Sequence, residues 1–136
     1  MSPERLTTDD AVDVIDVLAD AFAGYPVMRY VLGGPATADD PHLRSLVRFF
    51  VLARLWRDHP VLGIRAGGEL SATATITPPD PGPGSPELDA LREETWAELG
   101  VDARARYEAF GAACEAFTVD APHHHLNMIG VKRSHH

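Results

Sequence analysis

Apolar positions recur at helical spacing in the first third of the chain. The first stripe begins after Thr7 and Asp10, which have the spacing of a capping box, and it ends before Gly24. It consists of Val12, Ile15, Leu18, Ala19 and Phe22. Since a helix packs its apolar stripe against other elements, these residues are predicted to lie in the core. Residues 27–32 are predicted to be a short apolar connection that ends at Gly33.

A second helix is predicted to start at Asp40, a capping residue followed by Pro41 at the first helical position. Its apolar stripe is Leu43, Leu46, Val47, Phe50, Val51 and Leu55. Four arginines fall mostly on the other side: Arg44, Arg48, Arg54 and Arg57. They suggest phosphate binding, but an acidic chain offers many carboxylates, so a solvated helix face is favoured.

Strand signals follow the second helix. The runs 61–65 and 70–76 flank Gly67-Gly68, which predicts a β-hairpin. Near the end of the sequence, residues 126–131 form an apolar run that predicts a buried strand with Leu126, Met128 and Ile129 in the core. Since side chains alternate along a strand, His125 and Asn127 are expected on one face.

Two further helices are predicted between these strands, after a proline-rich loop at residues 78–86 that is interpreted as a linker. One begins at Ser85 and ends at Gly100, and the next is capped by Asp102. The second helix carries Tyr107, Phe110, Cys114 and Phe117 on one face. These helices are expected to cover the sheet; in the sharper alternative Trp96, Tyr107 and Phe110 line a substrate pocket.

The elements together predict an α+β fold in one domain, with a mostly antiparallel sheet of about four strands flanked by helices. The net charge of −8, without a basic cluster, argues against nucleic acid and is compatible with an amine-bearing substrate. No apolar run is long enough to span a membrane and no signal region begins the chain, so a cytoplasmic location is expected.

The cysteine does not predict a reactive site, and the adjacent histidines do not predict a metal site. Cys114 is the only cysteine, which excludes an internal disulfide, and it is interpreted as a small buried apolar residue. Adjacent histidines at 123–125 alternate faces in a strand and do not converge on one ion. No metal is therefore expected.

Residues 125–136 read His-Leu-Asn-Met-Ile-Gly-Val-Lys-Arg-Ser-His-His. This stretch resembles the fourth strand of the GNAT superfamily, the acyl-CoA-dependent N-acetyltransferases, in which an apolar strand ends in a small residue and valine. A Gln/Arg-x-x-Gly-x-Gly/Ala loop follows in that family, and His136 stands where its first residue would be. The resemblance implies that residues 1–136 are the N-terminal portion of a single GNAT domain, ending before the loop that binds the pyrophosphate of acetyl-CoA, with a first strand at Arg5–Thr7.

The resemblance also implies a site. Backbone groups of Met128, Ile129, Gly130 and Val131 on a bulged strand would bind acetyl-CoA, with His136 at the phosphate loop. Gly130 would let the cofactor approach the backbone. His125 would act through water as the base for a small-molecule or peptide amine, and Asn127 would orient that water.

Two alternatives remain open at this point. One is a non-catalytic binding or dimerisation module, in which the terminal strand is an exposed apolar edge that a partner strand or a second copy completes as a homodimer. The other is a small helical regulatory protein. If the chain is a fragment, it is expected to bind acetyl-CoA weakly or not at all when isolated.

Overall fold

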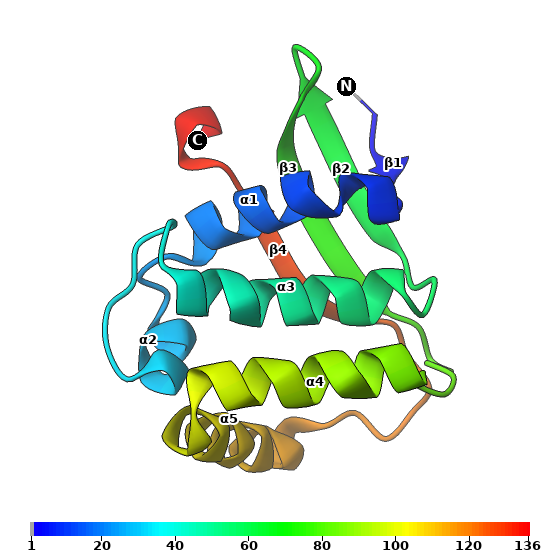
Figure 1. Ribbon diagram of the computed structural model, residues 1–136. Helices are drawn as coiled ribbons and strands as arrows, with labels where there is room; N and C mark the ends of the chain where they lie inside the picture. Colours follow the sequence, from blue (N-terminus) through cyan, green and yellow to red (C-terminus); the bar gives the residue numbers. More distant parts are fainter. Residues whose placement is uncertain (1) are drawn as a thin grey trace.

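The computed structural model describes residues 2–136 and has an α+β fold. Helices lie on one side of a four-stranded antiparallel sheet with strand order β1-β2-β3-β4 (Figure 1). In chain order the elements are β1 (Glu4–Arg5), a 3₁₀ turn (Thr8–Asp10), α1 (Ala11–Phe22), α2 (Pro26–Leu32), α3 (Pro41–Leu55), β2 (Val61–Ala66), β3 (Glu69–Thr77), α4 (Pro86–Leu99), α5 (Val101–Cys114), a 3₁₀ turn (Glu115–Phe117), β4 (His125–Val131) and a 3₁₀ turn (Arg133–His135). The predicted fold class is confirmed, and an all-helical fold is excluded for the described residues.

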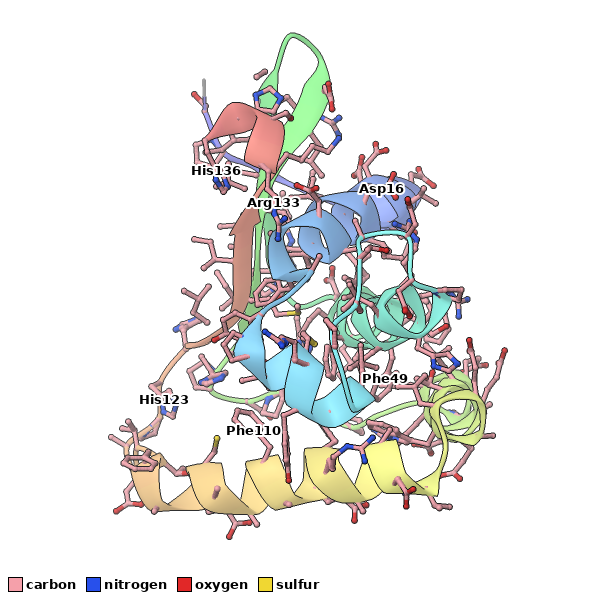
Figure 2. All side chains as sticks on the ribbon, turned by 90° about the vertical axis from the view of Figure 1, so that its left-hand side faces the viewer. Asp16, Phe49, Phe110, His123, Arg133 and His136 are labelled. Carbon is pink, nitrogen blue, oxygen red and sulfur yellow. The ribbon has the colours of Figure 1, made fainter. Side chains whose placement is uncertain are left out.

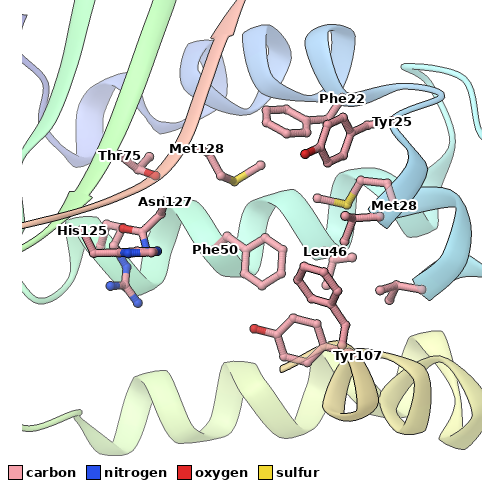
Figure 3. A pocket seen from close by; sticks show the side chains of 14 residues that line it. Phe22, Tyr25, Met28, Leu46, Phe50, Thr75, Tyr107, His125, Asn127 and Met128 are labelled. Atoms are coloured by element: carbon pink, nitrogen blue, oxygen red, sulfur yellow. The ribbon is translucent and has the colours of Figure 1, made fainter. Parts of the chain in front are cut away.

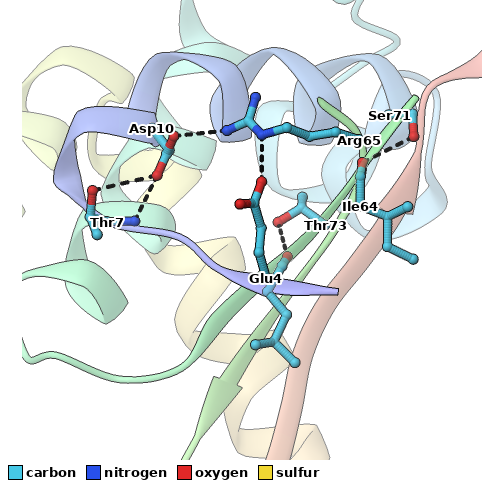
Figure 4. A network of polar contacts seen from close by, with 8 residues as sticks. Glu4, Thr7, Asp10, Ile64, Arg65, Ser71 and Thr73 are labelled. Carbon is cyan, nitrogen blue, oxygen red and sulfur yellow. Dashed lines mark hydrogen bonds and ion pairs between the residues drawn. The ribbon is translucent and has the colours of Figure 1, made fainter. Parts of the chain in front are cut away.

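The predicted capping box at Thr7 is formed. The backbone N–H of Thr7 donates to Asp10 Oδ2 at 2.9 Å, and Thr7 Oγ1 accepts from the Asp9 N–H at 3.3 Å. Asp10 also accepts from Arg65 Nη2 of β2 at 3.0 Å, while Arg65 Nε binds Glu4 of β1 (Figure 4). One arginine thus joins the first strand, the start of α1 and the hairpin.

The apolar stripe of α1 is rotated relative to the prediction. Val12 is 67% exposed, whereas Val14 and Val17 are fully buried beside Leu18. The predicted helical period was correct. The run of valine and aspartate residues, however, allows more than one face of the helix to be apolar. Packing of α1 against α3 and β4 selects the face that contains Val14. The prediction for Val12 was wrong.

Residues 26–32 form a helix, and the prediction of a connection there was wrong. Pro26 occupies its first turn, and Gly33 ends it in the left-handed conformation with φ of 85°. Both are helix-boundary signals, but seven residues are too few for the periodicity to be recognised.

The start of α3 and the hairpin are as predicted. Asp40 Oδ1 accepts from the N–H groups of His42 at 2.9 Å and Leu43 at 3.2 Å. The hairpin turn has positive φ at both glycines, 61° at Gly67 and 84° at Gly68, which is the backbone of a type I′ turn.

Helices α4 and α5 do not cover the sheet, so that prediction was wrong. They form a further layer, with α4 against α3 and α5 against α2 and α4 (Figure 1). The residue that precedes α5 is Gly100, so Asp102 lies in the first turn and is not the cap. Cys114 is exposed, contrary to the prediction, because the last turns of α5 extend beyond their neighbours.

Strand β4 lies at the edge of the sheet and pairs only with β3. Met128 and Gly130 are buried beneath the helices, but Leu126 is 53% exposed and Ile129 is 62% exposed on the opposite face. The prediction that Leu126 and Ile129 lie in the core was wrong, because no described element covers that face.

Gly130 marks the closest approach of β4 to α1. A Cβ atom built on Gly130 would lie 2.7 Å from Ala21 Cβ and 3.2 Å from Leu18 Cδ2. Both neighbours belong to a packed helix, and the alanine methyl group has no rotamer to change. The glycine is therefore required by packing, independently of any ligand.

We expect Gly130→Ala to lower the free energy of unfolding by about 1–3 kcal/mol, the usual cost of overpacking. The matched control is Gly111→Ala in exposed α5, where a new Cβ meets no atom within 4 Å. That change should raise stability by about 0.5–1 kcal/mol through helix propensity. Urea denaturation measures both, and equal effects of the two substitutions would contradict the packing argument.

Candidate functional site

A cavity of about 320 Å³ lies between the helices and the last two strands. Its walls come from α1, α2, α3, α5, β3, β4 and Tyr25 in the segment that joins α1 to α2 (Figure 3). The lining residues are Phe22, Tyr25, Val27, Met28, Val31, Leu46, Phe50, Arg54, Thr75, Tyr107, Phe110, His125, Asn127 and Met128. The predicted pair His125 and Asn127 thus lines one cavity.

A β-bulge gives β4 its geometry at this cavity. Thr75 pairs with Met128, but the next residue of β3, Ile76, pairs with Leu126. Asn127 is therefore the extra residue in β4. A bulge bends the strand and redirects side chains, which brings both His125 and Asn127 to the cavity side.

A polar chain fixes the position of Asn127. Arg54 Nη1 of α3 donates to Thr77 Oγ1, and Thr77 Oγ1 donates to Asn127 Oδ1 at 2.7 Å. The amide oxygen of Asn127 is therefore occupied, and its amide nitrogen has no hydrogen-bond partner in the described chain. Asn127 can donate a hydrogen bond to a water or ligand in the cavity.

His125 lies at the polar end of the cavity and is exposed to solvent (Figure 3). Its ring lies edge-on to the ring of His123, with centroids 6.3 Å apart. No carboxylate among residues 2–136 pairs with His125, so neither ring nitrogen is committed to an internal partner. Both ring nitrogens can therefore form hydrogen bonds with a molecule in the cavity.

The other end of the cavity is aromatic. The rings of Phe50 and Tyr107 have centroids 5.7 Å apart, and Phe22 and Tyr25 meet edge-on at 5.0 Å. Of the three aromatic residues predicted for a pocket, Tyr107 and Phe110 line this cavity. Trp96 does not, because it is buried against Tyr107 with centroids 5.1 Å apart.

The open edge of β4 presents only some of the backbone groups that were predicted to bind a cofactor. Lys132 N donates to Ser71 O of β3 at 2.8 Å. Backbone groups alternate sides along an antiparallel strand, so Gly130 and Met128 face β3. The N–H groups of Ile129 and Val131 therefore face the open edge, and the carbonyl of Val131 is contacted by His136 Nε2 at 3.0 Å.

Arg54 lines the cavity, although the charge pattern of its helix favoured a solvated face. Arg54 lies four residues after Phe50 and eight after Leu46, both on the apolar stripe, so helical spacing carried the signal. Burial lowers the pKa of the Arg54 guanidinium, and the positive charge of Arg57 lowers it further. Arg54 nevertheless stays charged at neutral pH.

A scan against protein-family models gave no match, and a search of curated proteins gave no match either. Within residues 2–136, no group of three or more His, Cys, Asp or Glu side chains is arranged to hold a metal ion. No helix in that range combines the length and apolar character needed to cross a membrane.

Burial raises the pKa of the Tyr107 phenol, an effect larger than the opposing charges of Arg54 and Arg92. The folded state therefore holds this proton more tightly than the unfolded state does. The contribution of this phenol to the free energy of unfolding is fully present below the ordinary tyrosine pKa of about 10. It is lost as the pH rises above that value, because the unfolded chain ionises first.

We expect Tyr107→Phe to make the alkaline loss of unfolding free energy less steep than in the original protein. The control is Tyr30→Phe, which removes an exposed phenol on α2 and should leave the original slope. Denaturant titrations between pH 8 and about pH 11 measure the slopes. Identical slopes for all three proteins would exclude Tyr107 as a source of the pH dependence.

Proposed function

We propose that this chain belongs to an acetyl-CoA-dependent N-acetyltransferase of the GNAT type, which acts in the cytoplasm on a small-molecule or peptide amine. The observation that carries the proposal is the bulge of β4 at Asn127. It combines an open strand edge with a cavity that contains His125. The bulge is also a feature that the resemblance at residues 125–136 implies.

The open edge of β4 suits an extended ligand that carries amide groups. The N–H groups of Ile129 and Val131 can pair with such a ligand as they would with another strand. When bound there, acetyl-CoA would supply an acetyl thioester. Met128 and Gly130 would support this edge from the sheet side, and a role for His136 at the phosphates stays a prediction.

The cavity residues have separate roles in this proposal. His125 accepts the proton of the amine through a water molecule, since imidazole is the most frequent general base in enzymes. Asn127 donates a hydrogen bond that orients the same water, and its own position is fixed by Thr77 and Arg54. The apolar wall formed by Phe50, Tyr107 and Met128 keeps bulk water from the amine.

The test is acetyl transfer by the full gene product that contains these residues. A panel of amines is incubated with acetyl-CoA, and released thiol and acetylated product are measured together. We expect His125→Gln to lower kcat by about 100-fold or more, the range for loss of a general base. His124→Gln removes an exposed neighbouring histidine and should leave kcat unchanged. Equal rates in the two variants would exclude His125 as the base.

A second candidate function is a non-catalytic module that binds a partner strand or a second copy. The exposed apolar side chains of Leu126 and Ile129 beside an unpaired edge favour it. Light scattering separates the candidates: a dimer that Ile129→Lys abolishes, without acetyl transfer, supports the module, since lysine at an edge opposes strand pairing. The gene sequence after the codon for His136 adds a test, because a glycine-rich continuation supports the transferase.

A further inference from the structure

A second cavity, of about 280 Å³, lies between α3, α4 and α5. It is lined by Phe49, Phe50, Ala53, Arg54, Arg57, Arg92, Trp96, Arg104, Tyr107 and Glu108. Four of the 12 lysine and arginine residues meet there, in a chain of net charge −8. We term these residues, Arg54, Arg57, Arg92 and Arg104, the guanidinium cluster.

Two members of the guanidinium cluster have acidic partners. Arg104 Nε lies 3.2 Å from Glu108 Oε1, and Arg92 Nη1 lies 3.0 Å from Asp89 Oδ1. The Arg92 guanidinium also lies over the ring of Phe49, 5.7 Å from its centroid. Phe49 itself lies between α3 and α4 (Figure 2). These two arginines are neutralised and positioned within the protein.

The other two members have no acidic partner. Within residues 2–136, neither Arg54 nor Arg57 forms an ion pair, and the Nε atom of Arg57 is buried without a hydrogen-bond partner. Arg54 is half-buried, and the positive charge of Arg57 repels the positive charge of the Arg54 guanidinium. Two adjacent positive charges in a partly desolvated cavity are unfavourable unless an anion joins them.

The charge and geometry of this cavity point to one kind of ligand. A phosphate monoester carries a charge of −1.5 to −2 near neutral pH, which matches the two unpaired guanidinium groups. Guanidinium groups bind phosphate oxygens through paired N–H donors, and the aromatic walls limit competition from water. A carboxylate would neutralise only one of the two charges.

We propose that the guanidinium cluster binds the phosphate group of a small molecule, with Arg54 and Arg57 as its two principal donors. This site does not depend on the proposed acetyl transfer, and it lies at the opposite end of β4 from His136. The two cavities share Phe50, Arg54 and Tyr107. A phosphate bound here therefore contacts the same arginine that positions Asn127 through Thr77.

Inorganic phosphate is the probe, titrated by calorimetry into the intact protein at constant ionic strength, with acetate as the monoanionic comparison. We expect saturable phosphate binding that is stronger than acetate binding. Arg57→Gln should weaken it by about tenfold, the effect of losing one charged hydrogen bond. Arg48→Gln is the matched control, because Arg48 is an exposed arginine of α3, the helix that precedes Arg57, and lines neither cavity.

A second measurement keeps the test independent of folding defects. Arg57→Gln removes a like charge from the vicinity of Arg54, so the ligand-free variant should unfold at the same or a higher temperature than the original protein. Lower ligand-free stability with unchanged phosphate affinity would identify Arg57 as a structural residue and overturn the proposal. Phosphate binding no stronger than acetate binding, or equally weakened by Arg48→Gln, would also overturn it.

Discussion

The contact between α1 and β4 at Gly130 is the constraint on which the other features depend. Because Gly130 has no side chain, Ala21 and Leu18 of α1 can lie directly on the strand. The segment after the strand is attached to the same helix, since Arg133 donates from its backbone to Asp20 at 2.7 Å and from its side chain to the Ala23 carbonyl at 2.6 Å. With one end of β4 fixed in this way, the bulge at Asn127 and the open edge of the strand have defined positions beside the cavity.

Hydroxyl side chains connect the sheet to the polar end of that cavity. Thr73 and Thr75 are buried on the helix side of β3, and Thr73 Oγ1 donates to the Leu62 carbonyl at 2.7 Å. Small side chains at these positions allow α1 and α3 to approach the sheet, and the hydrogen bond to the Leu62 carbonyl satisfies the Thr73 hydroxyl. Thr77 continues this series of threonines along β3, and its hydroxyl group links Arg54 to Asn127 by hydrogen bonds. The cavity therefore has a rigid polar end, built on strands, and an aromatic end, built on helices.

Local signals in the sequence were sufficient for much of the fold. Capping at Thr7, Asp40 and Ser85 and the glycine pair of the hairpin depend on neighbouring atoms, and all were predicted correctly. Tertiary packing decided the rest: the rotation of α1 away from Val12, and the position of α4 and α5 beyond the sheet. For the site, strand alternation predicted a common face for His125 and Asn127, and the bulge at Asn127, which the pattern of residue types does not reveal, brings both to the cavity. Arg54 was missed because charge was taken to mean solvent exposure, although its helical phase matched Phe50 and Leu46.

The aromatic end of the cavity depends on the least enclosed helix of the fold. Every residue from Glu108 to Asn127 is exposed, so the C-terminal turns of α5 have few packing contacts to hold them. Amides in such a segment exchange with solvent through local opening, at a lower free energy than global unfolding requires. Tyr107 and Phe110 lie where the well-packed turns of α5 give way to these turns. Local opening of these turns would move Tyr107 and Phe110 away from the cavity, so we expect an occupant that contacts both rings to slow amide exchange in this part of α5.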